Sequence, residues 1–448
     1  MNPILAACAA ILTLAQLALP KRYAFLPLVV AACHLGNGEL LPQLSMARIL
    51  ILTGLIRALA QGSFRCSWSV KLDRCFFFFV FFAIISSAGH NYAEENPWTA
   101  HAGLAFNVCG AYLYGRAYLP DAEAFRRFAY TLPLVLLPLG GVMALEKRTQ
   151  RNLYFYLGAA EQQTLVREGK VRAQGPFRHP ILAGCAGAST LPFAYLLWRR
   201  RTRIKGILGF TGCLLVVIAC ASSGPLAAVA VSALAVVLWR FRPAGLTLFR
   251  RFVIVFGLLF WVIRGKGPWY LMASIDLVGG STGWHRAKLF DQGFTYLDEW
   301  WLYGTDYTRH WMSSGVRWTA NHSDITNYYL HLGVIGGLPL TLCLVFAFVV
   351  SFRALGRRMT EMRAQSDDTE VVLWCAGTAL AAHAFACISI SYFDQIYVLL
   401  YLLFGAVPGL VTASNAVPSQ ENTDAPAADL PAPTAMALPR YYHAVLAC

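Results

Sequence analysis

Charged residues are scarce in this sequence, and acidic residues are scarcer than basic ones. Only 13% of the 448 residues are Asp, Glu, Lys or Arg, whereas 57% are hydrophobic. A soluble globular domain carries about 25% charged residues, and a disordered chain is more polar still, so both classes are disfavoured. The 23 acidic residues stand against 37 basic ones, which leaves a net charge of +14. The composition therefore predicts a membrane protein in which the position of the positive charge is informative.

The sequence also lacks the short motifs of several chemistries. Its 12 cysteines form no CxxC pair and no cluster with histidines at metal-ligand spacing. It contains no glycine-rich phosphate loop, no internal repeat, and no pair of matching Gly/Pro-broken spans of the kind that inverted-repeat transporters have. We therefore expect no disulfide framework, no metal, no cofactor and no nucleic-acid partner.

Long hydrophobic runs are what the sequence has instead. A membrane helix needs about 20 apolar residues, and charged or Gly/Pro-rich breaks divide the chain into about 13 apolar runs. We therefore predict an all-α polytopic integral membrane protein with about 12 to 13 transmembrane helices. The runs lie near residues 3–19, 23–36, 44–60, 75–89, 98–119, 128–145, 181–198, 206–220, 225–239, 252–264, 325–352, 371–391 and 395–413.

Basic clusters recur in alternate connections between these runs, which orients them. By the positive-inside rule these connections are cytoplasmic. The opposite, outer face then receives residues 147–180, residues 265–324 and the turn Ser222–Pro225, with the N-terminus outside. Lys21 and Arg22 follow the first run instead of preceding it, so we expect a retained span rather than a signal peptide. The clusters include Arg65, Lys71 and Arg74; Arg126 and Arg127; Arg199–Arg203; Arg240–Arg251; and Arg353–Arg363.

The runs and connections divide the chain into four regions. Residues 1–146 are predicted to be N-terminal transmembrane helices, and residues 147–352 a core that carries the two long outer loops. Residues 353–413 are predicted to form C-terminal transmembrane helices. The last region, 414–448, is rich in Ala, Pro, Asn and Asp and is predicted to be a disordered cytoplasmic tail.

The loop at 147–180, here called the basic loop, breaks the charge rule. It holds seven basic residues against two acidic ones, a net +5 on the face where positive charge is normally depleted. A misplaced topology or anionic lipid headgroups would explain this. We prefer an anionic ligand, because guanidinium groups suit phosphate and pyrophosphate. Gly175 and the neighbouring prolines are expected to hold Arg172, Arg178 and His179 near the next span.

The loop at 265–324, here called the large loop, has five basic and six acidic residues and is rich in tryptophan. Its tryptophans fit either an interfacial belt or stacking on sugars. An amphipathic helix is predicted to begin at Gly283 and carry Arg286, and a turn follows at Trp301–Gly304. The loop closes with His322, which is expected at the outer membrane edge.

These residues resemble the O-antigen ligase and Wzy-type polysaccharide polymerase superfamily. The resemblance rests on the Arg286 helix, the turn before Gly304, the His322–Asn327 segment and the Gly333–Gly337 helix, and it is best over residues 147–352. It implies a GT-C-like helical fold and a metal-independent glycosyltransferase in the bacterial inner membrane. Such enzymes move a glycan from undecaprenyl pyrophosphate, at the periplasmic face, to an acceptor, which is lipid A core sugar in ligases and another lipid-linked unit in polymerases.

The resemblance also assigns site residues. His322 matches the family's required histidine and Arg286 its large-loop arginine. Many members have a Ser-Arg-Gly turn between two spans, whereas the turn Ser222–Pro225 has no arginine. We hypothesise that Arg172 or Arg178 supplies the missing charge, in a single inverting displacement with His322 as general base and the arginines holding the pyrophosphate.

Several alternatives stay open. Two further residues, His179 and Asn327, are candidate substrate contacts, although His179 could equally be a turn residue. The bland interpretation of His322 is a capping histidine hydrogen-bonded to Asp324. A transporter or flippase of lipid-linked saccharide would need a cationic site too, and a noncatalytic assembly factor is a third reading.

Other polar residues are expected to have no part in the site. His331 is expected to pack within its helix, on the face opposite to His322, and Asp394 to be a loop residue. Snorkelling explains the arginines near span ends, which are Arg48, Arg57 and Arg116.

Overall fold

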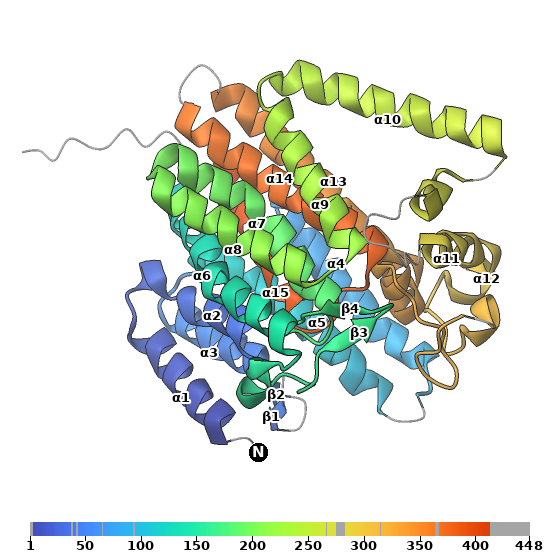
Figure 1. Cartoon of the computed structure of the whole chain (residues 1–448), viewed down its shortest axis with the longest axis horizontal. Helices are drawn as coiled ribbons and strands as arrows, with labels where there is room; N and C mark the ends of the chain where they lie inside the picture. The colour runs from blue at the N-terminus through green and yellow to red at the C-terminus, as the bar shows by residue number, and fades with distance from the viewer. Residues whose placement is uncertain are drawn as a thin grey trace, which may run out of the picture. The chain divides into compact units, whose positions relative to one another are not determined.

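The structure, a computed structural model, describes residues 3–36, 39–41, 44–64, 66–92, 95–265, 267–274, 283–313, 315–362 and 367–412 (Figure 1). The predicted tail, 414–448, lies outside the described residues. The α-helices are α1 (Pro3–Ala18), α2 (Leu26–His34), α3 (Met46–Ala60), α4 (Lys71–Ser86), α5 (Pro97–Tyr118), α6 (Ala122–Thr149), α7 (Pro180–Arg200), α8 (Arg203–Ala219), α9 (Ser223–Leu238), α10 (Arg242–Arg264), α11 (Gly283–Thr295), α12 (Leu297–Trp300), α13 (Tyr328–Met362), α14 (Asp367–Ser389) and α15 (Ile396–Thr412).

Short elements fill the connections. The strands of the described residues pair antiparallel, β1 (Glu39–Leu41) with β2 (Leu44–Ser45), and β3 (Leu165–Arg167) with β4 (Lys170–Arg172). The 3-10 helices are η1 (Lys21–Tyr23), η2 (Ser87–Gly89), η3 (Leu153–Leu157), η4 (Pro268–Ser274) and η5 (Arg309–Met312).

A helix forms in every predicted apolar run, so the mostly helical fold is confirmed. Among the described residues, five helices are long and apolar enough to cross a membrane: Lys71–Gly89, Ala122–Thr149, Pro180–Arg200, Tyr328–Met362 and Asp368–Ser389. The helices α1, α9 and α15 are apolar but shorter. The chain thus has the helices of a membrane protein, while the number of 12 to 13 spans stays a prediction.

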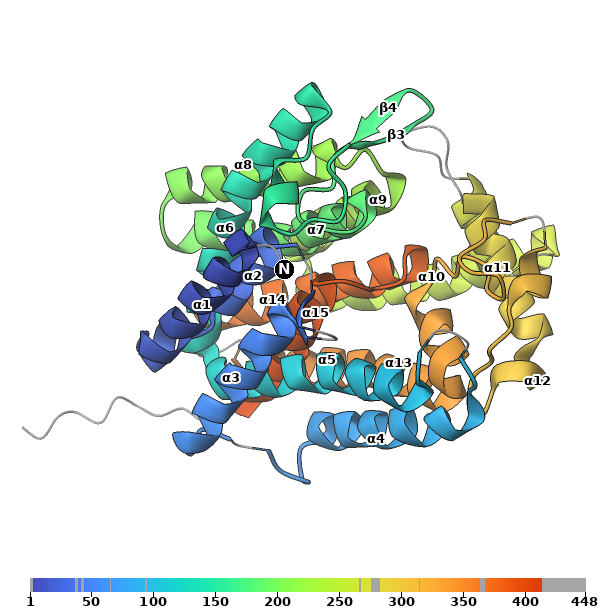
Figure 2. The ribbon, with the colours of Figure 1, turned by 90° about the horizontal axis from the view of Figure 1, so that it is seen from below.

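Helices α7 and α15 form the centre of the packing. α15 is buried from Ile396 to Leu410, and it packs against α5, α13 and α7. Its contact with α5 is close because two glycines face each other, as is usual where membrane helices approach closely. A Cβ atom on Gly405 would lie 2.2 Å from the Tyr112 carbonyl oxygen, and one on Gly115 would lie 2.6 Å from the Leu402 carbonyl oxygen. Figure 2 shows α4 running beside α5 and α13.

A kink in α13 joins this helix to the large loop. The backbone leaves helical geometry at Gly336 and Gly337, and Gly337 has a φ of 74°. The loop turn packs into the kink, where Leu338 N–H donates to the Trp301 carbonyl at 2.8 Å. Gly304 has a φ of 98° and lies against the Val334 carbonyl, so a side chain could not be placed there. The predicted turn at Trp301–Gly304 is confirmed.

The connections that the charge pattern assigns to one face also meet in space. The basic loop reaches the turn before α9 through a hydrogen bond between Arg172 and Ser222, and Arg286 of the large loop lies within electrostatic range of Arg172. Connections assigned to the opposite face meet as well, because Arg200 forms an ion pair with Asp368. Which of the two faces lies on the outer side of the membrane stays a prediction.

Candidate functional site

A cleft of about 890 Å³ opens at the end where the basic loop and the large loop meet. Its walls include the α4–α5 connection, the first half of α5, residues 305–306 and 318–325, the first turns of α13, and the α14–α15 connection. Two of the predicted site residues, His322 and Arg178, line this cleft. The cleft therefore combines segments that lie far apart in the sequence.

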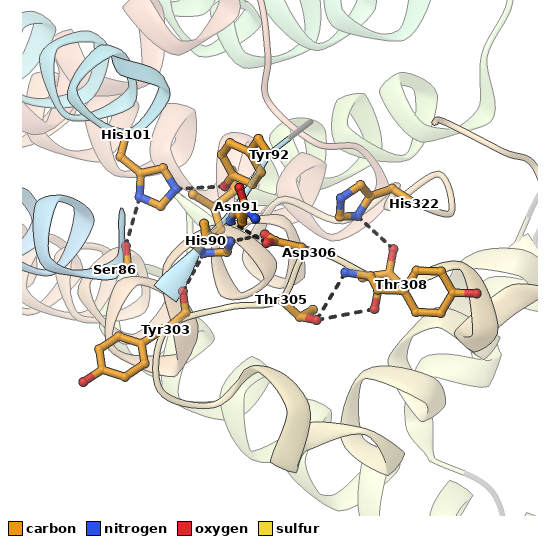
Figure 3. A network of polar contacts seen from close by, with 12 residues as sticks. Ser86, His90, Asn91, Tyr92, His101, Tyr303, Thr305, Asp306, Thr308 and His322 are labelled. Carbon is orange, nitrogen blue, oxygen red and sulfur yellow. Dashed lines mark hydrogen bonds and ion pairs between the residues drawn. The ribbon is translucent and has the colours of Figure 1, made fainter. Parts of the chain in front are cut away.

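His322 is presented to the cleft by a tightly hydrogen-bonded turn. Its backbone N–H donates to Thr319 Oγ1 at 3.1 Å, and its carbonyl accepts from Trp318 N–H at 3.0 Å. Its ring Nδ1 lies 3.3 Å from Thr308 Oγ1 (Figure 3). Among the described residues the His322 ring contacts Thr308 and forms no hydrogen bond with Asp324, so this part of the bland interpretation is wrong.

The Thr308 hydroxyl is compatible with a tautomer of His322 in which Nε2 carries the lone pair. Thr308 is buried, and its Oγ1 also accepts from Ser323 N–H at 3.1 Å. With Nδ1–H donating to the second lone pair of Oγ1, the Nε2 atom of His322 keeps its own lone pair. Within the described part of the chain, Nε2 has no hydrogen-bond partner. Burial lowers the pKa of His322, against the opposing field of Asp306, so the imidazole is neutral near pH 7.

Arg172, His179 and Arg286 form a second group, here called the basic cluster. Arg172 ends β4 and donates from its guanidinium to Ser222 Oγ at 2.5 Å. Arg286 lies in the first turns of α11 and donates from Nε to the Ser389 carbonyl at 2.8 Å. Both arginines are buried, with 6% and 9% of their surface exposed. Among the described residues neither forms an ion pair, although Asp324 lies within electrostatic range of Arg286.

Burial shifts the titration of the basic cluster without discharging its arginines. It lowers the pKa of Arg286 to about 10, and it lowers the pKa of Arg172 as well. Burial, together with the two guanidinium charges, lowers the pKa of His179 to about 4. At pH 7 both arginines are therefore cationic and His179 is neutral. The neutral ring accepts Ile181 N–H at 3.2 Å and caps α7.

The two arginines proposed to replace the missing one are separated by the structure. Arg172 lies at the turn Ser222–Pro225, where the resemblance expects a cation. Arg178 is exposed and lines the cleft, and its backbone N–H donates to Asp394 Oδ2 at 2.9 Å. The basic cluster thus contains Arg172, and Arg178 belongs with His322.

The Asn327 side chain forms hydrogen bonds that join the start of α13 to α14. Its Oδ1 accepts Leu330 N–H at 3.0 Å, which caps α13, and its Nδ2 donates to the Ile388 carbonyl at 3.3 Å. The side chain is buried and does not line the cleft. Its role in binding substrate stays a prediction.

Glu146 holds the basic loop through hydrogen bonds, a role that the sequence analysis did not predict. Its side chain is fully buried at the end of α6. The carboxylate accepts hydrogen bonds from Gln174 N–H at 3.0 Å, from Gly175 N–H at 2.9 Å and from Thr164 Oγ1 at 3.2 Å. A single carboxyl group therefore fixes the segment that follows Arg172. The available signal was a lone acidic residue at the end of a long apolar run.

Three residues that were expected to have no part in the site also line the cleft. Arg48 does so while its Nε donates to Asn107 Oδ1 at 2.8 Å, and Asp394 does so beside Arg178. His331 lines the cleft as well. The expectation that His331 faces away from His322 is wrong because α13 begins at Tyr328, so no helix connects the two histidines.

The other two arginines near span ends bond to groups of the protein. Arg116 is buried and forms an ion pair with Asp73 at 3.1 Å. Arg57 donates to the Leu19 carbonyl at 2.6 Å. Snorkelling is therefore the wrong description of Arg116, whereas for the half-buried Arg57 it stays a prediction.

A polar network ties the α4–α5 connection to the large loop beside His322 (Figure 3). His90 is buried, and its Nδ1 bonds to Asp306 while its Nε2 lies 2.8 Å from the Tyr303 carbonyl. Asp306 also accepts Asn91 N–H at 2.7 Å. His101 belongs to the same cluster, with its Nε2 2.9 Å from the Tyr92 hydroxyl.

Comparison with known proteins adds no identity: no family model matches the chain, and no curated protein matches it. Among the described residues, no group of three or more His, Cys, Asp and Glu side chains is arranged to hold a metal ion.

Proposed function

We propose that this protein is a membrane glycosyltransferase. It moves a glycan from a polyprenyl-pyrophosphate carrier to an acceptor hydroxyl at the periplasmic face of the bacterial inner membrane, as the O-antigen ligases and polymerases that its sequence resembles do. The observation that carries the proposal is the basic cluster beside the cleft. Two buried cations from different loops, Arg172 and Arg286, lie there, and neither forms an ion pair with a carboxylate of the described residues.

Buried cations of this kind need an anion. A charged group removed from water without a partner destabilises the fold by several kcal/mol, so a chain keeps one where a ligand or a reaction uses it. Guanidinium groups bind phosphate oxygens through paired hydrogen bonds. A pyrophosphate is therefore a fitting occupant, and its developing charge in the transition state would be stabilised by the same two groups.

His322 supplies the second half of the chemistry. The acceptor hydroxyl must lose a proton as it attacks the anomeric carbon, and a neutral imidazole can accept that proton near pH 7. When Nδ1–H donates to Thr308 Oγ1, Nε2 is the ring nitrogen that accepts this proton. The bond from the anomeric carbon to the carrier phosphate breaks as the new glycosidic bond forms, and the carrier leaves as its pyrophosphate.

The membrane arrangement belongs to the same proposal. The apolar helices would form 12 to 13 spans, with the basic loop and the large loop on the periplasmic side. The pairing of Arg200 with Asp368 supports this, because both lie at connections that the positive-inside rule assigns to the cytoplasm.

A transfer assay tests the proposal. Full-length protein in liposomes is given a polyprenyl-pyrophosphate oligosaccharide and an acceptor glycan, and His322→Ala is compared with wild type. We expect transfer by wild type and a loss of at least about 100-fold in the variant, with binding of a lipid-pyrophosphate analogue retained. Transfer at the wild-type rate by His322→Ala would overturn the proposed base.

The same liposomes separate transfer from transport. Movement of the labelled lipid between leaflets without any glycosidic bond formed would identify a transporter or flippase instead. In cells, a deletion strain that keeps single glycan units but loses chain length indicates a polymerase. Loss of attachment with long chains still on the carrier indicates a ligase.

A further inference from the structure

The cleft and the basic cluster have opposite charge. The cleft is lined by two guanidinium groups and four carboxylates, namely Arg48, Arg178, Glu95, Asp306, Asp324 and Asp394. Burial raises the pKa of Asp324, but three carboxylates remain against two cations even if Asp324 is counted as neutral. The basic cluster contains two cations, and the carboxylate within electrostatic range of Arg286 is Asp324, one of the four that line the cleft. A phosphate group is therefore attracted to the basic cluster and disfavoured in the cleft, since like charges across a binding surface act against a partner.

The uncharged part of the cleft suits a sugar. Its lining combines amides and hydroxyls with aromatic rings, which include Asn91, Asn107, Thr319, Tyr92, Trp318 and Phe393. Amide and hydroxyl groups both donate and accept hydrogen bonds, as sugar hydroxyls do, and aromatic faces pack against the apolar faces of sugar rings. Trp318 has 67% of its surface exposed beside Phe393, with the ring centres 6.2 Å apart.

One polar side chain in the cleft is held in a fixed orientation. Arg48 Nε–H donates to Asn107 Oδ1 at 2.8 Å, which determines which end of the amide faces the arginine. The Asn107 Nδ2 group has no hydrogen-bond partner among the described residues, so it can donate to a ligand hydroxyl. His322 lines the same cleft, which puts the proposed base beside any hydroxyl bound there.

We propose that the cleft is the acceptor site and that it selects a saccharide without phosphate or carboxylate groups near the reacting hydroxyl, either neutral or bearing an amine. This rests on the proposed function, and it adds the acceptor's chemical class. The pyrophosphate of the donor is held apart in the basic cluster, and Glu95 and Asp306 exclude it from the acceptor side. Such an acceptor is the non-reducing end of a neutral or amino-sugar glycan.

Direct binding tests this without requiring transfer. Free oligosaccharides with one common core and a neutral, amino, uronate or phosphorylated terminal sugar are titrated into the full-length protein. We expect the neutral and amino forms to bind at least tenfold more tightly than the uronate and phosphorylated forms. Trp318→Ala should weaken binding of the neutral form at least fivefold and Trp318→Phe should restore it, whereas Trp284→Ala, an exposed tryptophan of α11 that does not line the cleft, should have no effect.

A charge variant tests the selectivity itself. Glu95→Gln should reduce the discrimination against the phosphorylated form at least threefold, and Glu123→Gln, an exposed carboxylate on α6, should leave it unchanged. Equal binding of neutral and phosphorylated forms by wild type would overturn the acceptor site as described. If wild type binds the neutral form selectively but forms no glycosidic bond, the proposed function fails and the saccharide site stands.

Discussion

Arg172 donates a hydrogen bond to Ser222 Oγ over 2.5 Å, so a cation from the basic loop lies at a turn whose own sequence has none. Fifty positions separate the two residues. The contact places the charge beside Arg286, in a cluster that neither loop could form alone. The cation at this turn is thus supplied by a different segment from the one that the resemblance indicates.

The first prediction concerns the two buried arginines. Arg172→Ala and Arg286→Ala should each weaken binding of a lipid-pyrophosphate analogue at least tenfold, because a charge-assisted hydrogen bond contributes about 1.5 to 3 kcal/mol. Replacement by Lys should recover only part of this, since the paired guanidinium geometry is lost. Equilibrium binding in detergent measures both effects.

Arg178→Ala is the matched control for this prediction, because Arg178 is exposed and lines the cleft. It should leave the affinity for the analogue within about twofold of wild type. Thermal stability separates binding from folding, because removing a buried cation that forms no ion pair with the described residues should not destabilise the protein. A lower melting temperature with unchanged affinity in Arg172→Ala would make that residue structural.

The second prediction concerns pH. The base must be neutral, and burial lowers the pKa of His322 from its ordinary value of 6.5. The transfer rate should therefore rise with pH through a midpoint below 6.5 and then stay level. It should not fall between pH 7 and 9, because the pKa of Arg286 remains at about 10. A rate profile at saturating donor and acceptor measures this, and a midpoint above 7 would contradict it.

The third prediction concerns the hydroxyl that orients His322. Thr308→Val keeps the shape of the side chain but removes the acceptor for Nδ1–H and for Ser323 N–H. We expect kcat to fall about tenfold or more with little change in KM for the donor, because the wrong tautomer presents N–H to the acceptor. Thr308→Ser should recover most of the rate. Equal losses in the Val and Ser variants would point to packing instead of tautomer control.

Much of the fold could be predicted from local patterns. Helices arise where apolar runs are long, and alternating basic connections assign their ends, so the meeting of Arg172, Ser222 and Arg286 follows from the sequence in outline. The kink of α13 could not be predicted, because Gly336 and Gly337 lie in an apolar run and leave helical geometry where the large loop packs against them. That kink helps to position residues 304–308.

Which residues line the cleft could not be predicted from the sequence. His90 meets Asp306 across 216 positions, and Arg178 meets Asp394 across the same separation. Hydrophobic periodicity and the alternation of charge do not indicate which residues so far apart in the sequence come into contact. Arg48 illustrates the consequence, because an arginine near a span end has the same local pattern whether it snorkels or lines a cleft.

The last prediction concerns Glu146, which binds the basic loop through three hydrogen bonds from Thr164, Gln174 and Gly175. Removing the acceptor leaves two backbone N–H groups without a partner, and each charge-assisted bond contributes about 1.5 to 3 kcal/mol. Glu146→Ala should therefore destabilise the protein by about 3 kcal/mol, and Glu146→Gln by about half as much, because the amide keeps one accepting oxygen.

The consequence for function should be confined to the donor side. Amide hydrogen exchange at Gln174 and Gly175 should accelerate in Glu146→Gln, and the affinity for the lipid-pyrophosphate analogue should fall because Arg172 is no longer held at Ser222. Binding of a neutral saccharide in the cleft should not change. Glu123→Gln is the control, since Glu123 makes exposed ion pairs with Arg126 and Arg127 that contribute at most about 1 kcal/mol. Faster exchange with unchanged donor affinity would show that the shape of the basic loop does not govern the position of Arg172.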